Sequence, residues 1–461
     1  MNKKQLQIFN ILFGPVLFLL VYLSDIKGLS HEGKAVMACT LWVAFWWITE
    51  AVELPVTSLL PIVLFPLSGA LPLKATTAEY GNPFIFLFMG GFLIGLAIEK
   101  WNLHKRIAFK IIEKIGTRER SVLLGFMVAT AFISMWISNT ATAVMMLPIG
   151  LSVSAYFGNN QLFKQNLMLG IAYAASSGGM ATLIGTPPNI ILAAVLKNSA
   201  GIEISFLNWM LFATPFSLIL LLVCWWHLSR KLGRGVSQGF KLDNNELGTV
   251  TLPEKRVLMV FCLVAFFWIT RVFLWNKFIP ALDDTLIAMI GAIALFIIPS
   301  GIKGEKLLNW ETAKRLPWDV LLIFGAGLAI AKGFADTDLT QWIAQHFADV
   351  NVLPWVILLM VIAAINFLTE ITSNTATASI ILPILYSMSY SLNLNPLTLL
   401  VGAAIASSCA FMLPVATPPN AIVFSSGAVK IKDMMREGIF LNLTSILLTF
   451  LFVQTLIGVL Q

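Results

Sequence analysis

The hexapeptide Ser-Asn-Thr-Ala-Thr-Ala occupies residues 138–143 and occurs again at residues 373–378. Each copy lies inside an apolar run and is followed by a second matched segment. That segment is Gly-Thr-Pro-Pro-Asn at 185–189 in the first case and Ala-Thr-Pro-Pro-Asn at 416–420 in the second. Two polar motifs repeated in the same order indicate an internal duplication, in which both halves of the chain share one architecture.

The composition is that of a membrane protein. Of the 461 residues, 58% are hydrophobic and only 11% are charged, whereas soluble domains carry about 25% charged residues. Apolar runs recur along the chain, and each is long enough to cross a hydrocarbon core of about 30 Å as a helix. We therefore predict an all-α polytopic membrane protein with about 11 transmembrane helices and two re-entrant hairpins.

The polar motifs are expected to lie at breaks in the helices. The apolar runs at 121–157 and 353–390 are too long for one crossing, and each has Ser-Asn-Thr near its middle. A polar tip between two half-crossings predicts a re-entrant hairpin, which is tolerated where the tip is buried in protein or faces water. The runs at 165–198 and 397–426 contain Pro-Pro pairs, which cannot continue a helix, so we expect discontinuous spans there.

The charges indicate that the two halves have opposite orientations. Residues 100–120 hold seven Lys or Arg and two Glu, with apolar residues at helical spacing, which predicts an amphipathic helix on the inner surface. The corresponding segment at 334–350 carries Asp336, Asp338 and Asp349 instead, and therefore belongs outside. Two inverted-topology repeats follow, the architecture of secondary transporters. The protein would lie in the plasma membrane with its N-terminus in the cytoplasm and its C-terminus outside.

Other function classes receive little support. The net charge of +7 arises from basic loops between spans, so it does not indicate a nucleic-acid partner. The four histidines are isolated near loops or span ends, without metal-ligand spacing: His31, His104, His227 and His346. Asp283 and Asp284 form the only acidic pair. We expect neither an enzyme nor a cofactor, while an anion channel remains an alternative. Glu50 and Glu53, at the end of the second apolar run, suit either an interfacial or an intramembrane role.

The residue types in the four motifs suit a site that holds a cation and an anion together. Asn, Ser and Thr side chains and unwound backbone offer oxygen ligands for sodium. The N-termini of half-helices present free N–H groups and a partial positive charge, which suit a carboxylate. Because a dianion is costly at low dielectric, bound cations nearby would offset its charge. This predicts cation-coupled transport. The alternative, that the polar residues only hold helices together, leaves the duplication unexplained.

The paired Ser-Asn-Thr and Thr-Pro motifs resemble those of the divalent anion/sodium symporter family, and the likeness extends over essentially the whole chain. The resemblance implies symport of sodium with di- and tricarboxylates of the succinate, malate and fumarate class. It also implies a homodimer in the lipid bilayer that works by an elevator motion. A sodium-independent dicarboxylate exchanger and a sulfate or citrate transporter of the same fold remain open.

The resemblance further implies a division of labour along the chain. Residues 1–99 and 255–333 would form the dimerising scaffold. Residues 100–227 would form the first transport repeat, with its surface helix, hairpin and broken span, and residues 334–461 the second. A cytoplasmic loop at 228–254 would separate the halves.

By motif match, the resemblance assigns nine residues to the substrate carboxylates: Asn139, Thr140, Thr186, Pro187, Ser373, Asn374, Thr375, Thr417 and Pro418. It assigns one sodium site to Ser134, Ser138, Asn139 and the backbone at Gly185. It assigns the other to Thr369, Thr372, Asn374 and the backbone at Ala416. Sodium would act as a co-substrate.

Overall fold

Helices account for the architecture of this protein, and the polar motifs lie at their ends. The computed structural model describes residues 3–158, 160–233, 248–346, 352–389, 392 and 394–460, and these residues contain no β-strand. The predicted all-α fold is therefore confirmed. Two predicted features lie outside the described residues: the centre of the loop at 228–254, and Asp349.

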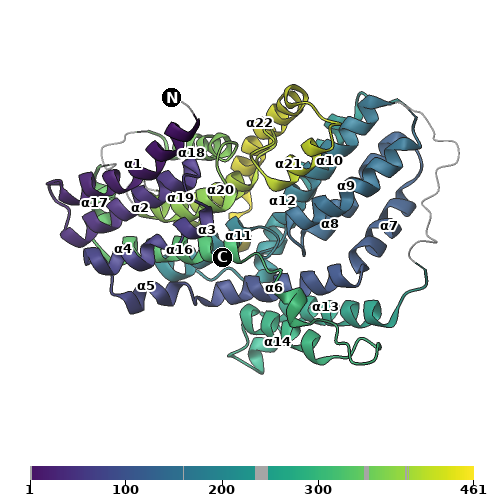
Figure 1. Cartoon of the computed structure of the whole chain (residues 1–461), viewed down its shortest axis with the longest axis horizontal. Helices are drawn as coiled ribbons and strands as arrows, with labels where there is room; N and C mark the ends of the chain where they lie inside the picture. The colour runs from purple at the N-terminus through teal and green to yellow at the C-terminus, as the bar shows by residue number, and fades with distance from the viewer. Residues whose placement is uncertain are drawn as a thin grey trace.

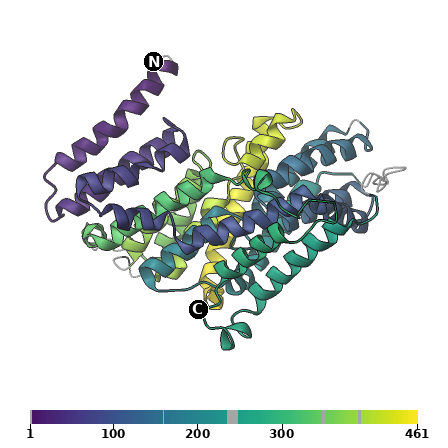
Figure 2. The same cartoon turned by 60° about the horizontal axis from the view of Figure 1, so that its bottom comes forward.

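The N-terminal helices are α1 (Lys3–Leu23), α2 (His31–Thr49), α3 (Leu54–Thr57), α4 (Leu60–Ser68), α5 (Leu73–Glu79) and α6 (Pro83–Lys100). Of these helices, α1, α2, α4 and α5 lie at one end of the molecule, and α6 runs from there along its middle (Figure 1). The apolar segment at 54–68 consists of two short helices. Pro55 and Pro61 each stand at the start of a helix, where proline is well tolerated, so the segment is divided into α3 and α4. Figure 2 shows α1 projecting beside α2 at the edge of the fold.

The first motif-bearing half continues with the helices α7 (Leu103–Ile115), α8 (Glu119–Ser134), α9 (Asn139–Ala155), α10 (Gln161–Gly179), α11 (Pro187–Val195), η1 (Leu196–Ala200) and α12 (Phe206–Ser229). Both predicted breaks are present, one between α8 and α9 and one between α10 and α11. The amphipathic segment forms α7, which buries Leu103, Ala108 and Ile112 and packs along α8.

A connecting group of helices then leads to the second half: α13 (Leu252–Thr270), η3 (Trp275–Lys277), α14 (Asp284–Ile297), α15 (Trp310–Ala313) and α16 (Trp318–Asp336). The second half comprises α17 (Leu339–His346), α18 (Pro354–Leu368), α19 (Asn374–Ser389), α20 (Pro396–Ser408), α21 (Pro418–Ser425), α22 (Ile431–Thr455) and η4 (Ile457–Leu460). The succession of helices and breaks from α6 to α12 recurs from α16 to α22. The breaks predicted at 353–390 and 397–426 are both present.

Apolar helices long enough to cross a membrane occur throughout the described chain. Five have the necessary length and composition: Lys4–Leu23, Leu73–Lys100, Phe206–Ser229, Trp318–Asp336 and Ile431–Thr455. Five shorter apolar helices accompany them, including α9, α14, α18 and α20. Shorter apolar helices are what half-crossings and broken spans require. The number of crossings and the inverted relation of the halves stay predictions.

Glycine allows the closest helix contacts in each half. A Cβ at Gly178 on α10 would collide with the Ala131 carbonyl on α8. A Cβ at Gly438 on α22 would collide with the Phe411 carbonyl, in the break between α20 and α21. Small residues at such positions let backbones approach closely, which is the usual basis of helix association in membranes.

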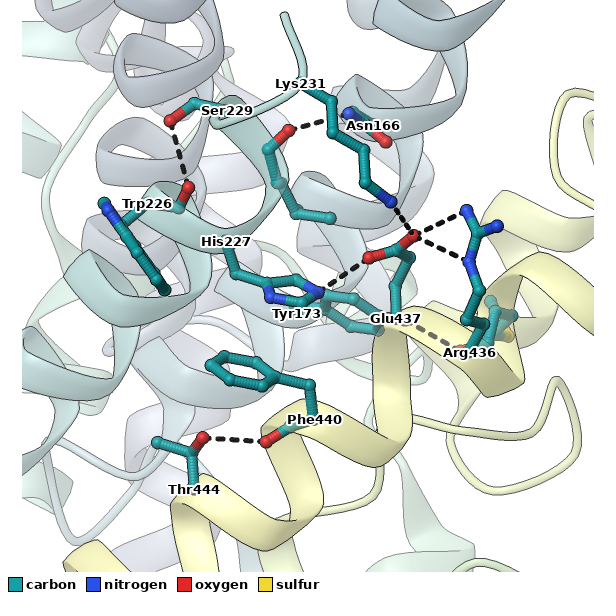
Figure 3. Close-up of polar contacts among 12 residues, drawn as sticks. Asn166, Tyr173, Trp226, His227, Ser229, Lys231, Arg436, Glu437, Phe440 and Thr444 are labelled. Atoms are coloured by element: carbon teal, nitrogen blue, oxygen red, sulfur yellow. Dashed lines mark hydrogen bonds and ion pairs between the residues drawn. The ribbon is translucent and has the colours of Figure 1, made fainter.

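Helices α12 and α22 are joined by a buried hydrogen bond between His227 and Glu437 (Figure 3). His227 on α12 lies 2.6 Å from one Glu437 carboxylate oxygen on α22, and its ring stacks on Phe440. Lys231 and Arg436 contact the other Glu437 oxygen at 3.2 and 2.7 Å. The side chains of His227 and Glu437 are only 2% and 7% exposed. Because α12 also packs on α8 and α10, and α22 on α18 and α20, the joint ties both halves together.

Replacing Glu437 with Gln should destabilise this joint. Gln is similar in size but removes the negative charge, which leaves buried His227 and two basic groups without a counter-charge. We expect the free energy of unfolding to fall by about 2–3 kcal/mol. This figure already allows for the exposure of Lys231 and Arg436, which weakens their interaction with Glu437. The loss would appear as a lower apparent Tm of the purified protein in detergent. Asp433→Asn, one turn earlier and more exposed, should leave the Tm unchanged. Equal Tm values for E437Q and D433N would contradict the role of the joint.

Candidate functional site

All four polar motifs stand at the N-termini of helices. Helix α9 begins at Asn139 and α19 at Asn374, while α11 and α21 begin at Pro187 and Pro418. Ser138 caps α9 by accepting a hydrogen bond from the Ala141 N–H at 3.2 Å. Pro at the first helical position costs no hydrogen bond, because the first N–H groups of a helix have no internal partner. Each motif therefore presents the positive end of a helix dipole.

The four helix ends meet in one cavity of about 2000 Å³. All nine residues predicted to contact substrate line it: Asn139, Thr140, Thr186, Pro187, Ser373, Asn374, Thr375, Thr417 and Pro418. Four predicted sodium ligands also line it: Ser138, Gly185, Thr372 and Ala416. Ser134 and Thr369 are not among the lining residues and are fully buried behind the wall. The structure thus brings together segments from both halves of the chain.

Ser134 and Thr369 occupy matching positions, each five residues before the motif asparagine. The Ser134 hydroxyl donates to the Asn139 side-chain oxygen at 2.6 Å. The Thr369 hydroxyl lies 2.7 Å from the Asn374 side-chain oxygen and 2.8 Å from the Ser407 carbonyl, and its one proton is shared between these two acceptors. These bonds fix the direction of both amide groups and place two oxygen ligands side by side in each half.

Thr372 behaves differently from Ser134 and Thr369. Its hydroxyl donates to the Leu368 carbonyl at 2.9 Å and lies 2.6 Å from the Thr377 hydroxyl. The side chain is thus occupied within the hairpin. Only its backbone carbonyl is left to act as the sodium ligand that the motif predicts.

The asparagines that end the Pro-Pro-Asn segments hold the breaks in shape, a role that motif matching missed. Asn189 donates to the carbonyls of Met180 and Thr182 at 3.1 and 2.7 Å. Asn420 donates to the carbonyls of Ala410 and Leu413 at 3.2 and 3.0 Å. Both asparagines are fully buried. Their presence in both copies of the motif was the signal that would have found them.

Glycine lets the first break press against the first hairpin tip. A Cβ at Gly179 would collide with the Asn139 side-chain oxygen, and one at Gly185 would collide with the Gly179 carbonyl. The Asn139 amide, Gly179 and Gly185 are therefore stacked without room for a further side chain.

Glu370 is a charged residue beside the second tip that the motif analysis also missed. It is 4% exposed and follows Thr369 directly. Its carboxylate accepts hydrogen bonds from the backbone N–H groups of Phe411, Met412 and Leu413 and from the Asn442 side chain. An acidic residue inside an apolar run is a signal of function in membrane proteins, and it was visible in the sequence.

The far end of the cavity is lined by charged residues: Glu50, Glu99, Lys100, Lys105, Glu254, Arg315 and Asp319. Several are paired, since Arg106 contacts Glu254 at 3.0 Å, Arg315 contacts Glu99, and Lys100 contacts Glu305 at 2.8 Å. Burial lowers the pKa of His104 at this end, where its Nδ1 lies 3.0 Å from the Ile98 carbonyl. Glu50 ends α2 and lines the cavity wall, whereas Glu53 is not among its lining residues.

Metal ligation by acidic or soft side chains finds no support here. Across the described ranges, no group of three His, Cys, Asp or Glu is gathered closely enough to hold a metal ion. The oxygen-rich sets around Asn139 and Asn374 instead consist of hydroxyls, amides and backbone carbonyls, which are ligands that a monovalent hard cation accepts.

Comparison with known proteins gives matches over nearly the whole chain. The family described as the transmembrane region of sodium:sulfate symporters matches residues 3–460. The sodium-dependent dicarboxylate transporter SdcS of Staphylococcus saprophyticus is 44% identical over 486 residues, covering 99% of this chain and 93% of the relative. SdcS of Staphylococcus aureus is 43% identical over 470 residues, covering 97% and 90%.

Two solved transporters share the fold. The YdaH transporter of Alcanivorax borkumensis has a TM-score of 0.59 at 13% identity, covering 84% of this chain and 87% of its own. MtrF of Neisseria gonorrhoeae has a TM-score of 0.58 at 11% identity, covering 97% and 98%. At these identities the likeness concerns the arrangement of helices alone.

The asparagine braces can be tested by their effect on stability. Asn189→Leu and Asn420→Leu nearly preserve side-chain volume but remove the donors, which leaves buried carbonyls without partners. We expect each variant to lose about 2 kcal/mol or more, measured as a lower apparent Tm in detergent. Asn208→Leu, at a partly exposed position of α12, serves as the control and should melt like the parent. If all three variants melt alike, the braces do not support the breaks.

Proposed function

Because the chain belongs to the sodium:sulfate symporter family, we propose that it is a secondary transporter that couples sodium to the movement of small dicarboxylates across the plasma membrane. The observation that carries the proposal is the meeting of four duplicated motifs in one cavity. The relatives named sodium-dependent dicarboxylate transporters support the choice of both ion and substrate. The chemistry is binding and release, so the proposal includes neither an enzymatic step nor a cofactor.

We propose one sodium site in each half. The first uses Ser134, Ser138, Asn139 and the carbonyl at Gly185, and the second uses Thr369, Asn374 and the carbonyls at Thr372 and Ala416. In each half a hydroxyl already lies within hydrogen-bond distance of an amide oxygen. A cation bound between the two oxygens would require the hydroxyl O–H to rotate toward another acceptor, while both oxygens could stay in place.

The substrate would lie between the two tips. Asn139, Thr140, Ser373 and Thr375 offer amide and hydroxyl groups, and the four helix N-termini supply partial positive charge. Two carboxylates on a short carbon chain match two tips that face one cavity. Sodium bound in each half would offset the dianion, which makes ion and substrate binding mutually dependent.

We infer that the cavity faces the cytoplasm in this conformation. Its charged end belongs to segments 99–105, 251–254, 300–302 and 315–320, on the side that carries the basic helix α7. Ser30 contacts Asp338 at 2.8 Å on the opposite side. Lining residues within the described chain include none from the segments around Ser30 and Asp338.

A buried ion pair closes the side away from the cavity mouth. Arg271 on the α13–α14 connection contacts Asp284 at 2.7 Å, and Asp284 also accepts a hydrogen bond from the Phe206 N–H at the start of α12. The pair thus attaches α12 to the proposed scaffold. An elevator motion of the two transport repeats, 100–227 and 334–461, would have to release this attachment. Residues 1–99 and 255–333 would stay fixed at the interface of a homodimer.

The central test is uptake into proteoliposomes. An inward sodium gradient should drive accumulation of labelled succinate above equilibrium, because sodium entry supplies the free energy. Replacing external sodium with choline should abolish accumulation, and equal uptake with choline would favour sodium-independent exchange. Unlabelled malate, fumarate, citrate and sulfate as competitors would define the substrate class. Flux that never saturates and follows only the substrate gradient would indicate a channel instead.

Asn139→Ala and Asn374→Ala should each reduce accumulation to background while the protein stays folded.

Orientation can be tested with two exposed lysines on either side of α14. Lys277 precedes this helix and Lys303 follows it, so a crossing places them on opposite faces. In a background without native cysteines, which removes the exposed Cys262, Lys277→Cys should react with an impermeant thiol reagent added outside intact cells. Lys303→Cys should react only after the membrane is opened. The reverse pattern would overturn the orientation, and labelling of both from outside would overturn the crossing by α14.

A further inference from the structure

The two halves of the site differ in one respect that the duplicated motifs conceal. Glu370 lies four residues before Asn374, and Met135 lies four residues before Asn139. The second half therefore has a carboxylate where the first half has a thioether. The two positions otherwise correspond, because each directly follows the residue whose hydroxyl bonds to the motif asparagine.

The carboxylate is held entirely by donors. One oxygen of Glu370 accepts from the Phe411 N–H at 2.7 Å and from Asn442 at 2.7 Å. The other accepts from the Leu413 N–H at 3.0 Å, and the Met412 N–H lies between the two oxygens at 3.0 and 3.1 Å. In all of these contacts the Glu370 carboxyl group acts as an acceptor, as an ionised carboxylate does. One negative charge is thus fixed in a nest of N–H groups.

The first half ties the same elements together without a charge. There the Thr182 hydroxyl donates to the Met135 carbonyl at 2.6 Å, which links the break after α10 to the end of α8. In the second half the Glu370 carboxylate links the break after α20 to the end of α18. The asparagine brace on the other side of each break is the same, Asn189 in one half and Asn420 in the other. The two attachments therefore use different groups, a neutral hydroxyl in the first half and a carboxylate in the second.

We propose that Glu370 is a positioning residue that adds one fixed negative charge beside the second sodium site, so that this site binds sodium more tightly than the first. The inference rests on the proposed sodium-coupled function. Glu370 adjoins Thr369, whose hydroxyl belongs to the second site, and its partner loop at 411–413 leads to Ala416, whose carbonyl belongs to the same site. A charge in a poorly solvated interior acts on a nearby cation far more strongly than it would in water.

The test measures sodium binding at one site at a time. Sodium raises the apparent Tm of a protein that binds it, and the concentration for half of the effect reports affinity. In an Asn139→Ala background only the second site remains, and there Glu370→Gln should raise the half-effect sodium concentration by about tenfold. In an Asn374→Ala background, which retains only the first site, Glu370→Gln should leave that concentration unchanged. Glu370→Asp keeps the charge and should restore affinity in the Asn139→Ala background.

Glu119→Gln provides a matched control. Glu119, at the start of α8, is also a buried carboxylate and is 6% exposed. It accepts a hydrogen bond from Asn160 and lies away from the motifs. The Glu119→Gln substitution should leave the half-effect sodium concentration unchanged in both backgrounds. A Glu370→Gln shift of less than twofold, or an equal shift in both backgrounds, would overturn the inference. Absence of any sodium effect on the parent protein would instead overturn the proposed function.

The opposite change tests the inference if Glu370→Gln does not fold. Met135 is partly exposed, so a polar side chain can be accommodated there. In the Asn374→Ala background, Met135→Glu should lower the half-effect sodium concentration relative to Met135→Gln, because it gives the first site the charge it lacks. Equal values for the two Met135 variants would contradict the proposed effect of a fixed charge.

Discussion

The need to satisfy backbone polar groups inside a membrane governs this structure. A helix that is interrupted in an apolar environment exposes N–H and C=O groups that water cannot reach. Here the exposed carbonyls of both breaks are met by the amides of Asn189 and Asn420, and the N–H groups of the second break are met by Glu370. Once these internal partners are in place, the N-termini that remain open all face one cavity. The groups available for binding are therefore the helix N-termini that the internal partners leave open.

The duplicated halves share a fold but not all of their interactions. Ser134 and Thr369 make the same hydrogen bond, although only the threonine also reaches a second carbonyl, that of Ser407. Glu370 has no acidic counterpart, because Met135 occupies the matching position. A duplication preserves what the helix geometry requires and leaves the remaining positions free to diverge. The divergent positions are therefore where the two proposed sodium sites could acquire different properties.

The sequence was informative wherever the controlling interaction is local. Pro-Pro pairs and Ser-Asn-Thr predicted the four breaks, since a proline or a capping serine acts on its own turn. The division of residues 54–68 into α3 and α4 could not be predicted from Pro55 and Pro61, because proline is tolerated inside membrane helices as well as at their starts. The partners of Glu370 could not be predicted, since Phe411 and Asn442 lie far along the chain and meet it only through tertiary packing. The same holds for Glu437 and His227.

The joint connects α12, from the middle of the chain, with α22, near its C-terminal end, so that the two helices form one mechanical unit. Each of these helices packs on the hairpin and broken span of its own half, so both tips are carried by the same unit. In the proposed elevator motion, one tip could not cross the barrier while its counterpart stayed behind. The proposed movement between the two faces would then be a single event with a single rate, and a protein loaded in only one half would wait for the other.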